Sequence, residues 1–271
     1  IDPPTIKVNN GVENAQVKED GTVDVALEAK LSADAETGEY LTVTVTGFDP
    51  AWGTVTAPVG SFNAAGTEWT ATLPANTDLS TVFTFTPAAE SDIDLTGLVA
   101  TVTAHDDVEG LSASATDSFN VIVDAVADAP DVTATGGTGA EGTTVAVNIA
   151  GALGTDMDGS ESITGYEVTG VPAGFTFSAG TEAGGVWTFT EAELAGLTLT
   201  GPANYNGTLA LTAKVLTKDT PSDDEFDTSD NTSSDTAAFT VSWSPEIDPP
   251  TIKVNNGVEN AQVKEDGTVD V

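Results

Sequence analysis

An internal repeat restricts how this chain can fold. Residues 1–25 recur without a change as residues 247–271, an offset of 246 residues (247 − 1). The chain therefore holds one complete unit and the opening of the next, as in a tandem array. We interpret a unit copied so faithfully as one that contributes length more than chemistry.

Apolar and polar residues alternate along five segments, a pattern that favours strands with one buried and one wet face. Gly, Pro, Asn and Asp clusters separate these segments at the spacing of a β-sandwich. Only Glu191–Gly196 has a helical pattern, about one turn long. We predict an all-β fold of tandem antiparallel, immunoglobulin-like sandwiches in an elongated array. The five segments are Thr22–Leu27, Leu41–Thr46, Val82–Thr86, Val99–Ala104 and Ser118–Val123.

The 246-residue unit is itself duplicated. Phe119–Val132 aligns with Phe239–Ile252 at a constant offset of 120 residues (239 − 119), and each segment runs from a last strand through a Pro-containing joint into a new first strand. Trp69 and Trp187 form a second matched pair, which predicts core tryptophans on equivalent strands.

These alignments predict three pieces: a module at 1–125, a module at 126–246, and an incomplete module at 247–271. The last piece is too short to bury a core alone. It is frayed, paired with a neighbour, exchanged between molecules, or the completion of a split module, and the sequence leaves these alternatives open.

The net charge of the chain limits the kinds of molecule that it can bind. The chain has 43 acidic and 7 basic residues, all lysine, for a net charge of −36. A nucleic-acid partner is excluded because phosphate binding needs a basic face, and an anionic membrane surface repels such a chain. No apolar run reaches 18 residues, so we expect no membrane insertion.

The chain has no cysteine, which indicates either a reducing compartment or an extracellular fold held by something other than disulfides. The carboxylates favour the second interpretation.

One acidic motif has the composition of a calcium loop. Asp156 and Asp158 are two residues apart, so their side chains point the same way in an extended segment, Gly159 permits a turn, and Glu161 can close the cluster. Ca²⁺ accepts 6–8 oxygen ligands, which suits such a set. A degraded copy in the first module retains three carboxylates, Asp34, Glu36 and Glu39.

Immunoglobulin-like strand order predicts where these loops meet. The first turn of a module, with Glu19 or Glu141, should lie beside the exit joint, whereas the loop between the last two strands should lie at the entry end. At the first joint, Val123–Pro130, carboxylates of both modules then converge. We predict this set of metal ligands to be Glu19, Asp124, Asp128, Asp156, Asp158, Glu161 and Asp219, with Asp92 as a further candidate.

The second joint, Ser242–Pro250, retains Glu246 and Asp248, and Asp2 is the earlier copy of Asp248. With Asp106 from the last loop of the first module, these residues and Glu141 complete the candidate ligands. Because like charges brought close repel strongly, we predict that several Ca²⁺ ions, mainly at the joints, serve as the missing cross-links.

Other acidic and aromatic residues have simpler interpretations. The stretch Thr217–Asp235, apart from Asp219, is interpreted as a solvated loop, and the four tryptophans as core or joint packing rather than a sugar-binding platform. One histidine, His105, and no cysteine or arginine leave no catalytic constellation, so we expect no enzyme.

Several segments resemble one protein family. They are Glu19-Asp-Gly-Thr, Leu41-Thr-Val-Thr-Val-Thr-Gly, Trp69-Thr-Ala-Thr, Val123-Asp-Ala-Val-Ala-Asp-Ala-Pro and Asp156-Met-Asp-Gly-Ser-Glu. The chain, over essentially its whole length, resembles the extender repeats of giant bacterial RTX (repeats-in-toxin) adhesins, which are cadherin-like or bacterial immunoglobulin-like β-sandwiches. Two departures are that the second joint lacks the Asp-Ala-Val-Ala-Asp of the first, and that the glycine-rich nonapeptides of RTX proteins are absent.

The resemblance implies an extracellular stalk on a bacterial surface, exported by a type I system and stiffened by linker calcium, that projects a distal ligand-binding region. The expected partners are neighbouring identical repeats of the same chain, and the fragment is expected to be monomeric. Two alternatives remain: a module that itself binds a glycan or a surface, and acidity that is an adaptation to salt without specific metal sites.

Overall fold

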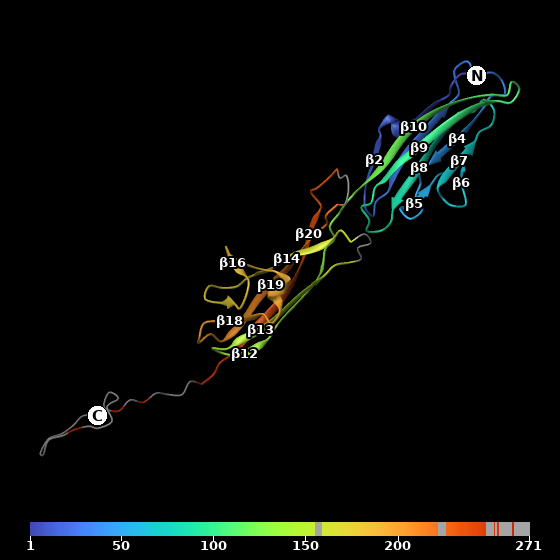
Figure 1. Ribbon diagram of the computed structural model, residues 1–271. Coiled ribbons are helices and arrows are strands. Elements are labelled where there is room, and N and C mark those ends of the chain that lie inside the picture. Colours follow the sequence, from blue (N-terminus) through green and yellow to red (C-terminus); the bar gives the residue numbers. More distant parts are fainter. Residues whose placement is uncertain (155–158, 222–225, 248–251, 253, 255–261, 263–271) are drawn as a thin grey trace.

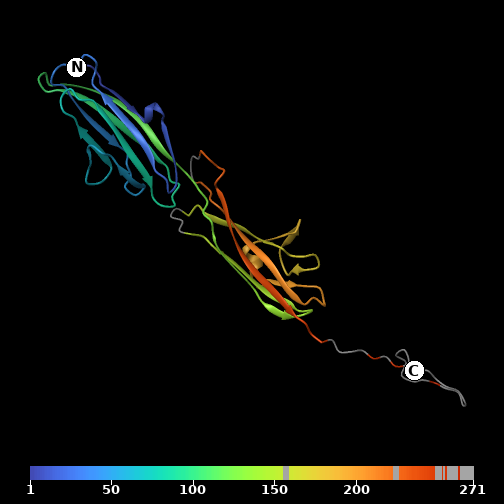
Figure 2. The same cartoon turned by 180° about the vertical axis from the view of Figure 1, so that it is seen from behind.

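The computed structural model describes residues 1–154, 159–221 and 226–247, together with residues 252, 254 and 262. It contains two elongated β-sandwiches that follow one another end to end, with the N-terminus at the far end of the first (Figures 1 and 2). Most of the predicted third piece, 247–271, lies outside the described residues. No helix in the described part has the length and apolar character needed to cross a membrane.

The first sandwich is built from ten strands in two sheets. Its four-stranded sheet has the order β1 (Thr5–Val8), β3 (Val23–Lys30), β8 (Leu79–Pro87), β5 (Gly53–Thr56), and its six-stranded sheet β2 (Asn14–Lys18), β10 (Leu111–Asp124), β9 (Leu95–Asp106), β4 (Tyr40–Thr46), β7 (Glu68–Thr72), β6 (Ser61–Phe62).

The second sandwich repeats this order strand for strand, so that β11 corresponds to β1 and β20 to β10. Its sheets are β11 (Asp131–Gly136), β13 (Thr144–Ala152), β18 (Thr198–Thr200), β15 (Thr176–Phe177), and β12 (Thr138–Ala140), β20 (Thr232–Ser244), β19 (Gly207–Lys218), β14 (Ser162–Thr169), β17 (Val186–Phe189), β16 (Thr181–Ala183).

The predicted all-β sandwich class is confirmed, and each of the five alternating segments lies in a strand: β3, β4, β8, β9 or β10. The described residues include two one-turn 3₁₀ helices, η1 (Asn9–Gly11) and η2 (Glu191–Leu194). The second is the predicted helical turn, and a capping box between Thr190 and Glu193 satisfies its first backbone donors.

The sheets are not wholly antiparallel. Among the described strands, β2 pairs in parallel with β10 over five residue positions, from Asn14 opposite Asn120 to Lys18 opposite Asp124. β12 pairs in parallel with β20 over three positions. The parallel pairs bring the end of each last strand beside the first turn of the same sandwich.

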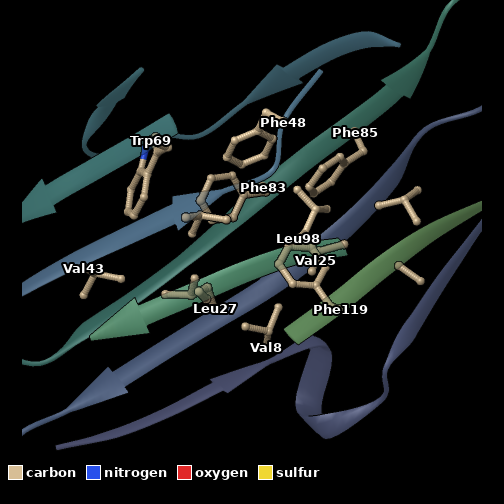
Figure 3. Packing of buried hydrophobic residues seen from close by; sticks show 14 of the residues in the cluster. Val8, Val25, Leu27, Val43, Phe48, Trp69, Phe83, Phe85, Leu98 and Phe119 are labelled. Carbon is tan, nitrogen blue, oxygen red and sulfur yellow. The ribbon is translucent and has the colours of Figure 1, made fainter. Parts of the chain in front are cut away.

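The core of the first sandwich follows from alternation. Leu41, Val43 and Val45 of β4 point inward and are fully buried, and aromatic side chains fill the space between the sheets (Figure 3). Trp69 meets Phe83 edge to face with ring centroids 4.9 Å apart, and its indole N–H donates to the Val59 carbonyl at 3.0 Å. Such a pair is favourable beyond its buried area.

The matched tryptophans lie at equivalent places. Trp69 of β7 is opposite Val45 of β4, and Trp187 of β17 is opposite Val168 of β14. Trp69 is buried and Trp187 is partly buried against the second core. Trp52 and Trp243 are also buried, which confirms that the tryptophans serve packing.

Truncation of the first core should be costly. Because Phe83 is fully buried among aromatic rings, Phe83→Ala is expected to lower the free energy of unfolding of the first sandwich by about 3–5 kcal/mol. Calorimetry should show a lowered transition for this sandwich only. Val108→Ala, at a side chain that is 91% exposed, is the control and should change stability by less than about 0.5 kcal/mol. A loss below about 1 kcal/mol for Phe83→Ala would contradict the packing.

Candidate metal-binding joint

The first joint, Val123–Pro130, includes the end of β10, at Asp124, and leads directly to the start of β11, at Asp131. Its backbone is tied to both sandwiches. On the first side, the Glu19 N–H donates to the Asp124 carbonyl at 3.0 Å, and the Glu19 carboxylate accepts the Val126 N–H. On the second side, the Asp128 N–H donates to Glu161 Oε1 at 2.7 Å. The joint is therefore hydrogen-bonded from both ends.

Several carboxylates of this joint are withdrawn from water. Asp124 is fully buried, Asp219 is 3% exposed and Glu19 is 9% exposed. Asp92, the further candidate, is also buried. Removing a charged carboxylate from water is costly unless an opposite charge or hydrogen bonds compensate.

Four carboxylates line one small cavity between the sandwiches. Glu19 and Glu90 come from the first sandwich, and Glu161 and Asp219 come from loops of the second. The cavity has a volume of about 10 Å³, which is room for about one water-sized particle. Oδ1 of Asp219 is buried and has no hydrogen-bond partner among the described residues.

A second cluster lies beside this cavity. Asp124, Asp227 and Asp230 each offer a carboxylate oxygen within 4.8 Å of the other two. Oδ1 of Asp124 accepts the N–H groups of Phe226 and Asp227, at 3.1 and 3.0 Å. Its other oxygen, Oδ2, is buried without a partner in the described part of the chain. Both clusters thus present buried carboxylate oxygens that a cation could satisfy.

The interpretation of Thr217–Asp235 as a solvated loop was wrong for its described second half. Residues 226–230 contact the end of the first sandwich and the joint: the N–H groups of Phe226 and Asp227 donate to Asp124, and the Asp230 carbonyl accepts the Ala127 N–H at 3.0 Å (Figure 1). These partners are about a hundred residues apart in sequence, so no local pattern indicates the contact.

Glu90 was also missed. It lies in the loop after β8 with a φ of 52°, and its N–H donates to Asp20 Oδ1 at 3.2 Å. Burial, a hydrogen bond with Asp128, and the charges of Asp128 and Asp20 raise the pKa of Glu90 to about 7. Burial is the largest cause of this raised pKa, and the neighbouring carboxylates add to it.

This shift predicts a pH dependence for the joint without divalent cations. A raised pKa in the folded state contributes stability below the unfolded value near 4.5, and that stability is lost as the pH rises through about 7. The melting temperature in EDTA should therefore fall between pH 5 and pH 7.5, and Glu90→Gln should flatten that fall. Glu13→Gln, at an exposed residue, is the control. An equal pH dependence in Glu90→Gln and the parent would refute the assignment.

Five other predicted ligands of the first sandwich gather at its free end. Asp2, Asp34, Glu36, Glu39 and Asp106 line one hollow of about 140 Å³. The Glu36 N–H donates to Glu39 Oε1 at 3.1 Å. A hydrogen bond with Asp34 and the charge of Asp34 raise the pKa of Asp2, and hydrogen bonds from Ser32 and then Asp2 lower that of Asp34.

This hollow corresponds to the first joint at two positions. Glu39 precedes β4 as Glu161 precedes β14, and Asp106 ends β9 as Asp219 follows the end of β19. Each sandwich therefore carries carboxylates at its entry end.

The remaining predicted ligands lie elsewhere. Glu141 is at the exit end of the second sandwich, where its N–H donates to the Ser244 carbonyl at 2.9 Å and its Oε2 accepts from Asn206 at 3.2 Å. It repeats the position of Glu19 and is not part of the first joint. Asp156, Asp158 and Asp248 lie outside the described residues.

Comparisons with known proteins found similarity to solved structures alone. No protein-family model matches the sequence, and no curated protein does. The fibronectin(III)-like modules of Clostridium thermocellum CbhA are 10% identical, with a TM-score of 0.23, over 92% of this chain and 100% of that one. The Yersinia pseudotuberculosis adhesin InvE is 13% identical, with a TM-score of 0.21, over 87% of this chain and 58% of that one. The assignment of fold class rests on the sheets described above.

Proposed function

We propose that this chain is a Ca²⁺-rigidified extender repeat of an extracellular bacterial adhesin of the RTX type. The observation that carries the proposal is the small cavity between the sandwiches, lined by Glu19, Glu90, Glu161 and Asp219. Its ligands come from both sandwiches, so occupation by one cation would join them.

The donor set fits a hard divalent cation. The four side chains offer only carboxylate oxygens, the ligands Ca²⁺ prefers. Asp219 and Asp124 each hold a buried oxygen without a partner among the described residues, an arrangement whose cost a bound cation would remove. When bound, Ca²⁺ would supply the positive charge that this cluster lacks.

Hydrogen bonds from residues of both sandwiches fix the backbone of the joint. Glu19 holds the backbone of Val126, and Glu161 holds that of Asp128, so both ends of the connection are already positioned. Repulsion among the carboxylates opposes this geometry without a counter-charge. The joint should therefore be straight with the cation and splayed without it.

Rigid, straight joints would increase the end-to-end length of an array of these modules. A freely jointed chain extends with the square root of the number of its links, whereas a rigid one extends in proportion to that number. In an array of identical units, neighbouring repeats are the partners, and the stalk would project a distal ligand-binding region from the cell surface.

Small-angle X-ray scattering of the whole chain tests the proposal. In 5 mM CaCl₂ the maximum dimension should match two sandwiches end to end, and EGTA should shorten and broaden the distance distribution. Equal MgCl₂ should restore less of the length, because Mg²⁺ demands shorter, near-octahedral coordination. Identical profiles in Ca²⁺ and EGTA would overturn the proposal, and full recovery in Mg²⁺ would favour acidity as an adaptation to salt.

A further inference from the structure

Lys18 is the basic side chain that the structure places in the first joint. It is the last residue of β2, and its Nζ contacts Asp227 Oδ2 at 3.1 Å and the carboxylate of Asp230. The partners are 209 and 212 residues away, in the loop before β20 of the second sandwich. One ammonium group thus links the two sandwiches directly.

The backbone places Lys18 for this contact. In the parallel pair of β2 and β10, Lys18 lies opposite Asp124. Asp124 accepts the N–H groups of Phe226 and Asp227, while Lys18 binds the side chains of Asp227 and Asp230. Adjacent strands of the first sandwich therefore bind the same loop, one through a carboxylate and the other through an ammonium.

Electrostatics agree with this placement. Hydrogen bonds from Ser229 and then from Lys18 lower the pKa of Asp227 to about 2, so it stays ionised. The same contacts, with Asp230 and then Asp227, raise the pKa of Lys18. The ammonium contacts two of the three residues, Asp227 and Asp230, that together with Asp124 could hold a metal ion.

We propose that Lys18 is a fixed cation of the first joint, which connects the two sandwiches when divalent cations are scarce and competes with such a cation for Asp227 and Asp230. The first half stands on the contacts alone, and the second half rests on the proposed function. Since an exposed ion pair is weak, Lys18 limits the swing of the joint without replacing a metal.

In the described part of the chain, the exit end of the second sandwich has no ion pair equivalent to that of Lys18. The hydrogen bond from the Glu141 N–H to the Ser244 carbonyl is equivalent to that from the Glu19 N–H to the Asp124 carbonyl. Ala140 therefore occupies the position equivalent to Lys18, and Ser244 the position equivalent to Asp124. At the described exit end of the second sandwich, alanine and serine thus replace the lysine and the buried aspartate. In an array of such units, joints of two kinds would alternate.

The test compares Lys18→Met with Lys30→Met in the whole chain. Lys30 contacts Glu28 of its own strand at 3.5 Å and serves as the matched control. Because the chain has no cysteine, spin labels can be attached at Val59→Cys and Ala183→Cys, both exposed and one on each sandwich. Pulsed electron paramagnetic resonance then measures the distance distribution between sandwiches.

In EGTA, Lys18→Met should broaden the distribution, Lys30→Met should leave it unchanged, and Lys18→Arg should restore it. In calorimetric titrations, Lys18→Met should bind Ca²⁺ about two- to fivefold more tightly, the factor expected for removal of one exposed ion pair. If the distance distribution of Lys18→Met in EGTA is as narrow as that of the parent, Lys18 does not connect the two sandwiches. If Lys18→Met binds Ca²⁺ no more tightly than the parent, Lys18 does not compete with the cation. If the parent chain does not bind Ca²⁺ but Lys18→Met broadens the distance distribution in EGTA, the proposed function is wrong, and the role of Lys18 in connecting the two sandwiches is retained.

Discussion

Calcium at 5 mM is expected to raise the melting temperature of the chain by several degrees relative to EGTA. Extracellular calcium modules bind with dissociation constants of about 10⁻⁴–10⁻³ M. Mass action then stabilises the folded joint by about 1–2 kcal/mol per site, which corresponds to about 3–15 °C for domains of this size. Differential scanning calorimetry in CaCl₂, MgCl₂ and EGTA measures the shift.

Magnesium is the control for specificity. It carries the same charge, so nonspecific screening of the carboxylates would give equal shifts in the two salts. A shift specific to Ca²⁺ would mean that the cavity lined by Glu19, Glu90, Glu161 and Asp219 is a site. Equal melting in all three conditions would refute it and favour the alternative of a module that itself binds a glycan or surface.

The second large effect concerns Asp219. Asp219→Asn removes one negative charge and one carboxylate ligand from the cavity. Ca²⁺ affinity should therefore fall by at least about tenfold, since loss of groups that only support the ligands already lowers metal affinity by that factor. Without metal the same substitution relieves repulsion among buried carboxylates, so the EGTA melting temperature should stay equal or rise. Titration and calorimetry together measure both changes.

The opposite signs make this prediction sharp, because a substitution that merely damages the fold lowers stability in both conditions. Asp235→Asn, at an exposed residue of β20, is the matched control and should change neither quantity. A variant at position 219 that binds Ca²⁺ as tightly as the parent would remove Asp219 from the site.

Local sequence rules were sufficient for the all-β class, for the five alternating segments and for the ends at which loops meet. Alternation in segments such as Leu41–Thr46 reports directly which side chains face the core, and the strand order of a sandwich then places Glu19 beside Asp124 and Asp106 beside Asp2. Both inferences depend on short-range patterns and on topology, which the sequence carries.

The contacts of Lys18, Glu90, Asp227 and Asp230 could not be predicted in this way. Each depends on the path of an irregular loop, and loops are held by individual hydrogen bonds between residues far apart in sequence, such as Asp227 to Asp124. The parallel pairing of β2 was missed for a related reason, since period-two alternation is the same in parallel and antiparallel strands.

Those parallel pairs decide how a stalk made of these units carries tension. β2 and the end of β10 run in the same direction, so a pull on the N-terminal side of β2 and an opposite pull on the C-terminal end of β10 shear the two strands past one another, and their hydrogen bonds share the load instead of breaking in turn. The first sandwich has five paired positions in this arrangement and the second has three. In a tandem array of such units, the β12 and β20 pair should separate at a lower force than the β2 and β10 pair, so the second sandwich of each unit would extend before the first.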